Sequence, residues 1–216
     1  MPAPIHNTAK ENILKRIRQA LSHPTAIPFP GSESAEDIFH PAPDSEELAL
    51  LFAEQFTQLQ GKFAYCSNTS ELGEQLTHLR KHKQFNKIFC NEQAIKQILT
   101  ELGVVTHNNN LADCDVSITG CEALVARTGS LLMSTAQSSG RTASVYAPIH
   151  ICIAFVSQLV YDIKDGLQYV KTHHEQLPSL ITLASGPSRT ADIEKTLVVG
   201  VHGPKEVYCF LVDDGV

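Results

Sequence analysis

The densest group of chemically active side chains in this sequence lies near its C-terminal end, between two Gly-Pro pairs. The segment 186–194 carries hydroxyl, guanidinium and carboxylate groups, and the segment 200–204 adds a histidine. An apolar, β-branched run at 179–184 predicts that a turn at Gly186 leaves the end of a buried strand. The chain would then enter a helix near Thr190, where backbone N–H groups, hydroxyls and a guanidinium favour an anion. The predicted anion contacts are Ser188, Arg189 and Thr190.

A second polar turn follows another strand-like run. Residues 116–120 form the strand-like run, 122–127 could form one or two helical turns, and a Thr-Gly-Ser turn at 128–130 leads into apolar residues 131–133. Because ligands of open α/β sheets bind at the carboxyl ends of strands, two such turns predict one shared pocket for a phosphate or carboxylate. Ordinary β-turns would explain the same pattern. The predicted ligand contacts here are Thr119, Gly120, Thr128, Gly129 and Ser130.

Three side chains are candidate catalytic groups. His150 and His202 lie close to proline or glycine, and an imidazole that titrates near neutral pH can take a proton from a hydroxyl-bearing carbon. Glu122 follows a turn and is a candidate base or carboxylate nucleophile. Structural roles would explain these residues equally well. Two further ligand contacts are predicted: Arg141, whose guanidinium could pair with an anion, and Asp192, near the positive end of the expected helix.

These segments occur together in an order that resembles the LUD domain, the family of the lactate-utilisation protein C subunit. They cover the C-terminal half of the chain. The residues that carry the resemblance are 118–120, 126–131, 140–141, 148–151, 157–158, 186–194 and 200–204.

The resemblance implies both a fold and a role. The fold is the α/β arrangement of ribose-phosphate isomerases, glucosamine-phosphate deaminases and CoA transferases, with a mainly parallel sheet flanked by helices. The role is oxidation of L-lactate to pyruvate beside partner subunits that carry iron–sulfur clusters. In this family the position of Arg127 often carries an acidic residue, so this chain departs from the family pattern there and lacks that acid.

The six cysteines are scattered and form no grouped Cys-x-x-Cys set. Iron–sulfur clusters and structural zinc sites commonly use grouped thiolates, so neither is expected in this chain. We therefore predict no metal ligands and no cofactor here, with iron–sulfur clusters on partner subunits. Each cysteine is expected to be a small buried hydrophobic residue, and Cys121, beside Gly120, is the one expected nearest the pocket.

Composition narrows the class of protein. The chain has 216 residues, 43% of them hydrophobic, which is enough for one substantial core. Its net charge of −6 leaves no basic surplus for a nucleic-acid backbone, so no nucleic-acid partner is expected. No run reaches the roughly 18 to 20 apolar residues of a membrane span, and residues 1–10 lack a signal-peptide core, which predicts a cytoplasmic protein.

The pattern of elements predicts an N-terminal extension and an α/β domain. A capping pattern and apolar spacing predict a helix before His23, and prolines mark residues 24–43 as an arm, so residues 1–43 form the extension and 44–216 the domain. Further helices are expected at 44–61, 70–83, 92–102 and 162–174. Strands are expected at 63–66, 87–90, 104–107, 115–118, 131–134, 144–147, 151–155 and 206–212. Their alternation predicts a mainly parallel sheet with an antiparallel part after residue 110.

The sequence leaves three hypotheses of function open. In the first, the chain is a metal-free subunit of a lactate-oxidising assembly and binds a small carboxylate or phosphate while partners move electrons. In the second, it is an independent enzyme for a phosphorylated, CoA-linked or folate-like acid, with Glu122 as base or nucleophile. In the third, it is a non-catalytic scaffold whose polar turns are structural. The scattered cysteines disfavour a self-contained redox enzyme.

Overall fold

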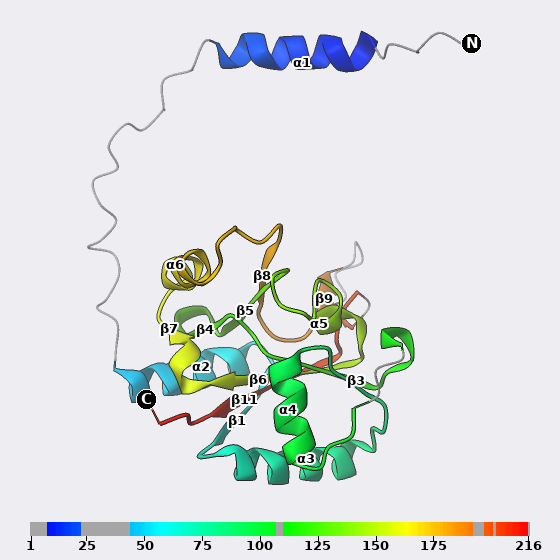
Figure 1. Ribbon diagram of the computed structural model, residues 1–216, viewed down its shortest axis with the longest axis vertical. Helices are drawn as coiled ribbons and strands as arrows, with labels where there is room; N and C mark the ends of the chain where they lie inside the picture. Colours follow the sequence, from blue (N-terminus) through cyan, green and yellow to red (C-terminus); the bar gives the residue numbers. More distant parts are fainter. Residues whose placement is uncertain (1–7, 23–43, 107–109, 192–196, 201, 216) are drawn as a thin grey trace. The chain divides into compact units, whose positions relative to one another are not determined.

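The computed structural model describes residues 8–22, 44–106, 110–191, 197–200 and 202–215, and the chain divides into two units between residues 41 and 42 (Figure 1). The described part of the first unit is helix α1 (Thr8–Leu21), which confirms the predicted N-terminal helix. Ile13, Leu14 and Ile17 form an exposed apolar stripe along it. The proline-rich arm predicted at 24–43 lies outside the described residues.

The centre of the second unit is a five-stranded parallel sheet in the order β1-β11-β6-β3-β2. Its strands are β1 (Lys62–Cys66), β2 (Ile88–Phe89), β3 (Val116–Thr119), β6 (Ile149–Phe155) and β11 (Glu206–Val212). β6 is the middle strand, and its first residue, Ile149, pairs with both Val116 and Glu206. The carboxyl ends of all five strands therefore point to one edge of the sheet, as in other open α/β folds.

A second, four-stranded sheet has the order β7-β4-β5-β8. Its strands are β4 (Ala123–Val125), β5 (Ser130–Ser134), β7 (Leu159–Val160) and β8 (Ile181–Ala184). β5 runs antiparallel to both β4 and β8, which confirms the predicted antiparallel part. A separate hairpin pairs β9 (Arg189–Ala191) with β10 (Leu197–Val199).

Helices cover both faces of the parallel sheet (Figure 1). Alternate residues of β11 separate the two sides: Tyr208 and Phe210 pack with α3 and α4, and Cys209 and Leu211 pack with α2 and the second sheet. A third, smaller cluster packs Val170 of α6 against the second sheet. The helices are α2 (Ser45–Gln58), α3 (Thr69–Lys83), α4 (Gln93–Glu101), α5 (Ala143–Tyr146) and α6 (Ile163–His173), with 3-10 turns η2 (Leu111–Asp113), η3 (Ala126–Thr128) and η4 (Val156–Gln158). The α/β fold class predicted from the sequence is confirmed.

Side-chain caps begin three of these helices. Asp44 accepts a hydrogen bond from the Glu47 backbone at the start of α2, as the sequence predicts. Asn68 does the same for Glu71 in α3, and Asp162 forms a capping box at the start of α6.

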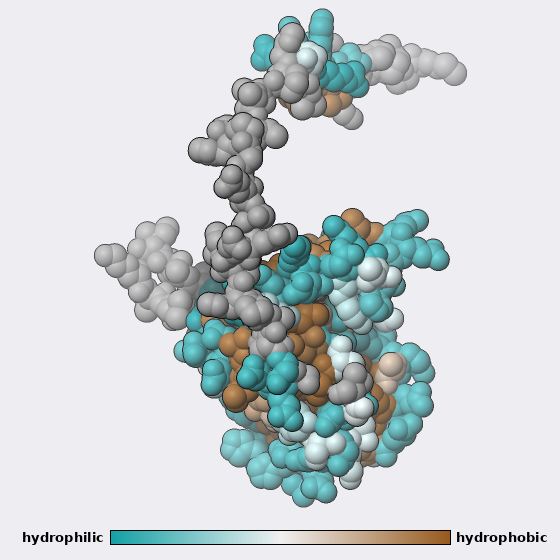
Figure 2. Space-filling view, turned by 90° about the vertical axis from the view of Figure 1, so that its left-hand side faces the viewer, coloured by the Kyte–Doolittle hydropathy of each residue, from teal (hydrophilic) through white to brown (hydrophobic). Residues whose placement is uncertain are grey.

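On the face seen in Figure 2, apolar side chains reach the surface in patches bordered by hydrophilic residues.

The prediction of a helix that begins near Thr190 is wrong, because residues 189–191 form strand β9. Thr190 pairs with Val198 across the hairpin. The β-branched and apolar residues 197–199 supply a strand partner, and this pairing outweighs the helix-start signal of the serine and threonine. The anion-binding helix start expected after Gly186 is therefore absent from the described residues.

Three other local predictions are corrected. Residues 143–146 form helix α5 where a strand was expected, because a short apolar run does not distinguish a strand from a buried helical turn. Residues 122–127, expected to be helical, form strand β4 and the start of η3. Residues 104–106 form no strand, because the Val104 N–H closes α4 by bonding to the Leu99 carbonyl.

Candidate functional site

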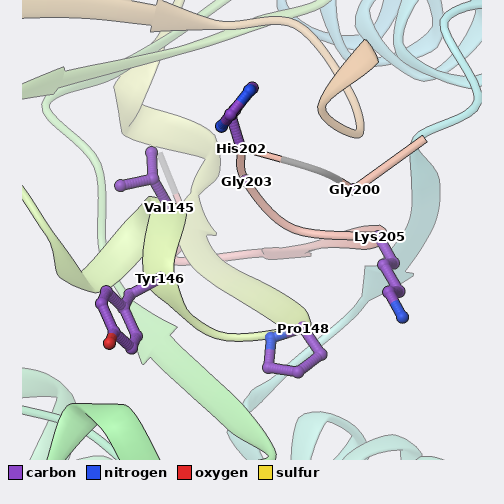
Figure 3. Close-up of a pocket in the computed structure, with 7 residues that line it drawn as sticks. All are labelled: Val145, Tyr146, Pro148, Gly200, His202, Gly203 and Lys205. Carbon is purple, nitrogen blue, oxygen red and sulfur yellow. The ribbon is translucent and has the colours of Figure 1, made fainter. Parts of the chain in front are cut away.

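A pocket of about 370 Å³ lies at the amino ends of β6 and β11 (Figure 3). Helix α5 forms one side, and the loop that leads into β11 forms the other. The lining residues are Val145, Tyr146, Pro148, Gly200, His202, Gly203 and Lys205. The second Gly-Pro motif of the sequence therefore forms a wall of this pocket.

Glycines and backbone hydrogen bonds hold the two Gly-Pro segments together beside the pocket. The Ser188 N–H donates to the Pro204 carbonyl, and the Gly200 N–H donates to the Ser188 carbonyl, both at 3.0 Å. Gly200 has a φ of +79°, and a Cβ on Gly203 would lie 2.8 Å from the Ser188 Cβ. Larger residues would separate the segments, so the glycines in this motif serve close packing.

The pocket combines basic groups with an apolar wall. Lys205 and His202 are both exposed, and their side chains extend in different directions from the loop (Figure 3). Val145 and Tyr146 are exposed large apolar residues of α5, at 44% and 58%. An ammonium group and an imidazole beside apolar carbon suit a small anion that carries an apolar group.

The predicted contacts Gly129 and Arg189 lie against helix α2. Arg189 donates a hydrogen bond from its guanidinium to the Leu59 carbonyl at the C-terminal end of α2. A Cβ on Gly129 would lie 2.4 Å from the Phe56 N, and one on Gly186 would lie 2.4 Å from the Leu59 O. Both polar turns therefore support the packing of α2, as the scaffold hypothesis expects.

The other residues of the Thr-Gly-Ser turn at 128–130 are also enclosed. Ser130 is buried, and its hydroxyl lies 2.6 Å from that of Ser185. The Thr128 hydroxyl is buried and has no hydrogen-bond partner in the part of the chain that the structure describes. Neither residue lines the pocket in Figure 3, so their contact with a ligand stays a prediction.

His150 is fully buried in the middle of the parallel sheet. Its Nε2 lies 2.9 Å from the Thr119 hydroxyl, which also donates to the Gly120 carbonyl. Desolvation lowers the pKa of His150 to about 4, so the imidazole is neutral near pH 7. This environment favours a structural histidine, and the catalytic role proposed for His150 stays a prediction.

Glu122 lies at the opposite edge of the sheet from the pocket. Its carboxylate accepts a hydrogen bond from the Ser134 hydroxyl, and His174 Nε2 lies 3.1 Å from both of its oxygens. A second carboxylate, Glu92, accepts a hydrogen bond from the Gly120 N–H at 3.1 Å. The structure therefore places Gly120 and Glu122 beside Glu92 and His174, which sequence reasoning missed.

Arg141 and Thr190, two of the remaining predicted contacts, are not among the residues that line the pocket. Arg141 is exposed and donates to the Ser179 hydroxyl at 2.9 Å. Thr190 pairs within the hairpin through its backbone, and Asp192 lies outside the described residues. Arg127, the departure from the family pattern, pairs with Asp162 at 2.7 Å and so joins η3 to the start of α6.

All six cysteines are free and buried, as predicted. Burial raises the pKa of the Cys66 and Cys90 thiols to about 11. Cys121 lies at the carboxyl edge and interacts with Cys152, and this hydrogen bond together with burial raises its pKa. Among the described residues, no group of three or more histidine, cysteine, aspartate or glutamate side chains could hold a metal ion.

Lys205 and Tyr146 also line the pocket without having been predicted. Lys205 directly follows the second Gly-Pro motif, so its position in the sequence could have identified it. Tyr146 had no such signal, because its segment was expected to be a strand.

In the part of the chain that the structure describes, no helix is both long and apolar enough to cross a membrane.

Comparisons with known proteins agree with this architecture. Residues 84–212 match the LUD domain family model, and the chain belongs to this family. It is 37% identical over 102 residues to lactate utilization protein C of Shouchella clausii, a match that covers 46% of this chain and 44% of that protein. It is 29% identical over 179 residues to lactate utilization protein C of Halalkalibacterium halodurans, covering 66% of this chain and 78% of that protein.

A solved structure shows the same fold. It is a DUF162 family protein from Deinococcus radiodurans, with a TM-score of 0.59 and 17% identity, and the match covers 79% of this chain and 99% of that chain. At this identity the likeness concerns the fold alone. The match to the Shouchella clausii relative spans less than half of that relative's length.

Proposed function

We propose that this protein takes part in lactate utilisation, as the subunit of a cytoplasmic L-lactate-oxidising system that binds a small carboxylate. Membership of the LUD family and the names of the two relatives support this role. The observation that carries the proposal is the pocket in Figure 3, whose lining includes Lys205 and His202 of the loop before β11 and Val145 and Tyr146 of α5.

The pocket offers each part of a 2-hydroxy or 2-oxo acid a suitable neighbour. The Lys205 ammonium attracts the carboxylate, and His202 offers a hydrogen bond to the hydroxyl or keto oxygen. Val145 and the Tyr146 ring provide an apolar surface for the methyl group. In this proposal the chain binds and orients the acid, and electrons pass to partner subunits that carry iron–sulfur clusters.

The proposal is tested by binding and by growth. Calorimetry with L-lactate and pyruvate should show saturable binding to the wild-type protein, weakened about tenfold or more in Lys205→Met, because the substitution removes a charged hydrogen-bond donor. A strain that lacks the gene should fail to grow on L-lactate and should recover with the wild-type gene. Lys171→Met, which changes an exposed lysine on α6, is the matched control and should restore growth.

Two results would contradict the proposal. Normal growth of the deletion strain on L-lactate would contradict the proposed role in lactate utilisation. Equal affinity of Lys205→Met and wild type for both acids would exclude the pocket as their binding site.

A further inference from the structure

A second cavity, of about 220 Å³, lies between the C-terminal half of α3 and the end of α4. Both helices pack on the same face of the parallel sheet, and β2 and β3 contribute to the bottom of the cavity (Figure 1). None of the described residues that line it also lines the pocket in Figure 3. The two cavities are therefore separate.

The floor of this cavity is apolar and belongs to the core. Leu76 of α3, Ile88 of β2 and Ile118 of β3 line it and are at most 3% exposed. Phe85, which lies between α3 and β2, is buried as well and adds an aromatic ring. A ligand that reaches the floor must present apolar atoms, because a polar group there would lose its hydrogen bonds to water.

The rim of the cavity is open to solvent. Thr77 of α3 and Gly103, which follows α4, both line the cavity and are exposed. The backbone at Gly103 is held in place, because its N–H donates to the Thr100 carbonyl at 3.0 Å. A Cβ placed on Gly103 would meet no atom within 4 Å. A small molecule can therefore enter the cavity on this side.

One face of α3 forms the wall opposite the end of α4. Its residues follow the i, i+3, i+4, i+7 spacing of a single helix face and are Gly73, Leu76, Thr77 and Arg80. Gly73 allows Leu102 to approach α3, because a Cβ on this glycine would lie 2.8 Å from the Leu102 Cδ2. Leu102 lines the cavity, so this contact limits the cavity at one end, and Arg80 lies two helical turns further along the same face.

Arg80 is the one charged side chain among the described residues that line the cavity. It is only partly exposed, and within the described part of the chain its guanidinium forms no ion pair. A positive charge in the last turn of α3 is favourable to the helix dipole, but Lys81 and Lys83 in the same turn already supply it. A guanidinium beside an apolar cavity can instead pair with the carboxylate of a ligand.

We propose that this cavity binds an apolar monocarboxylic acid, whose carboxylate pairs with Arg80 and whose hydrocarbon tail lies on the apolar floor. A guanidinium favours a carboxylate, and burial of each CH₂ group of the tail is favourable. The volume suits a tail of about five or six carbons, because a cavity of roughly 150 Å³ lined by similar side chains holds benzene. Lactate has no such tail, so this site lies beyond the proposed function and does not depend on it.

The test uses the full-length ¹⁵N-labelled protein, with the amide of Gly103 as a reporter at the rim. The protein is titrated with hexanoate, 1-hexanol and L-lactate, and the Gly103 resonance is followed by NMR. Hexanoate should shift this resonance saturably. 1-Hexanol, which lacks the carboxylate, and L-lactate, which lacks the tail, should each bind at least about tenfold more weakly at this place.

Variants of α3 make the test specific to the guanidinium. Arg80→Met should weaken hexanoate binding about tenfold or more, because it removes the charged donor and keeps an apolar side chain. Arg80→Lys keeps the charge and should have an intermediate affinity. Lys81→Met changes an exposed neighbour on the same helix, and this matched control should bind hexanoate as the wild type does.

Three outcomes would overturn the proposal. The first is that hexanoate does not shift Gly103 saturably in the wild-type protein. The second is that 1-hexanol or L-lactate shifts Gly103 at the same concentrations as hexanoate. The third is equal affinity of the wild type and Arg80→Met for hexanoate. The first two comparisons use the wild-type protein alone, so they decide the matter even if Arg80→Met does not fold.

Discussion

At the scale of single residues, burial determines which of the predicted histidines can do chemistry. His150 and His202 have similar neighbours in the sequence, but His150 is fully buried and His202 is exposed at the pocket. A fully buried imidazole pays a desolvation cost when it becomes charged, and this lowers its pKa. The two residues are therefore suited to different tasks, structural for His150 and ligand contact for His202.

Because His150 is buried, we expect the protein to lose stability in mild acid. The pKa of His150 is about 4 in the folded protein against an ordinary value of 6.5, so between these values the unfolded chain binds a proton that the folded chain does not. Stability is complete above pH 6.5 and falls as the pH drops toward 4. Between pH 7.5 and pH 5 the loss should be about 2 kcal/mol.

Urea denaturation at the two pH values measures this loss. His150→Gln should show a smaller difference between pH 7.5 and pH 5, because glutamine does not titrate. His78→Gln, at an exposed position on α3, should retain the wild-type difference. An unchanged pH dependence in His150→Gln would contradict the assignment.

At the scale of elements, the attachment of α2 to the second sheet depends on glycine. Gly129 has a φ of +56°, and its missing side chain leaves room for the backbone of Gln55 and Phe56. Phe56 is itself fully buried in the cluster between α2 and the two sheets. The Thr-Gly-Ser turn is thus a packing contact in this structure, whether or not it also touches a ligand.

Gly129→Ala should destabilise the protein by about 2 to 4 kcal/mol, because the new methyl group adds a collision with α2 to the strain of a left-handed alanine. Gly140→Ala isolates the strain, since Gly140 has a φ of +64° and nothing lies within 4 Å of the added Cβ. This control should cost about 1 kcal/mol. Denaturant titration compares the two variants. Equal losses in the free energy of unfolding would show that the close approach of Gly129 to α2 does not contribute to the cost of the Gly129→Ala substitution.

Local patterns predicted the first half of the domain better than the second. Helices α2, α3 and α4 carry apolar residues at helical spacing, and Asp44 and Asn68 cap α2 and α3 at their first residues. After residue 110 the strands are short and pair with distant partners, as when Leu131 pairs with Ala184. A strand that depends on such a partner has only a weak local signal, and this explains the errors at α5 and β9.

The candidate site shows the same limit. The second Gly-Pro motif identified His202 as a candidate, and the structure places His202 in the lining of the pocket; turns rich in glycine carry a local signal in the sequence. Glu92 and Glu122, by contrast, meet only because β2 lies beside β3 in the sheet. Strand order is a tertiary property, so the sequence pattern could identify Glu122 as a candidate but not its partner.

At the scale of the whole molecule, the two edges of the parallel sheet carry opposite chemistry. The amino edge holds Lys205 and His202, and the carboxyl edge holds Glu92 and Glu122. Under the proposed function, partner subunits accept the electrons released when lactate is oxidised.

Under the proposed function, we expect this chain to contain no iron of its own. Protein purified anaerobically without partners should be colourless and contain no stoichiometric iron, because its cysteines are dispersed and buried. Metal analysis and an absorption spectrum provide the measurement. About four iron atoms per chain, with the absorbance of a cluster, would place the redox centre in this protein instead.

Under the proposed function, association with partners should involve α1, whose exposed apolar residues Ile13 and Ile17 could form a contact surface. In the full-length chain, the double substitution Ile13→Glu and Ile17→Glu should weaken binding to the iron–sulfur subunits about tenfold or more while leaving the melting temperature of the α/β domain unchanged. Asn12→Glu with Gln19→Glu adds the same charge to the polar side of α1 and is the matched control. Affinity purification with iron analysis compares the variants, and equal recovery of iron-bearing partners by both would exclude the stripe as the contact surface.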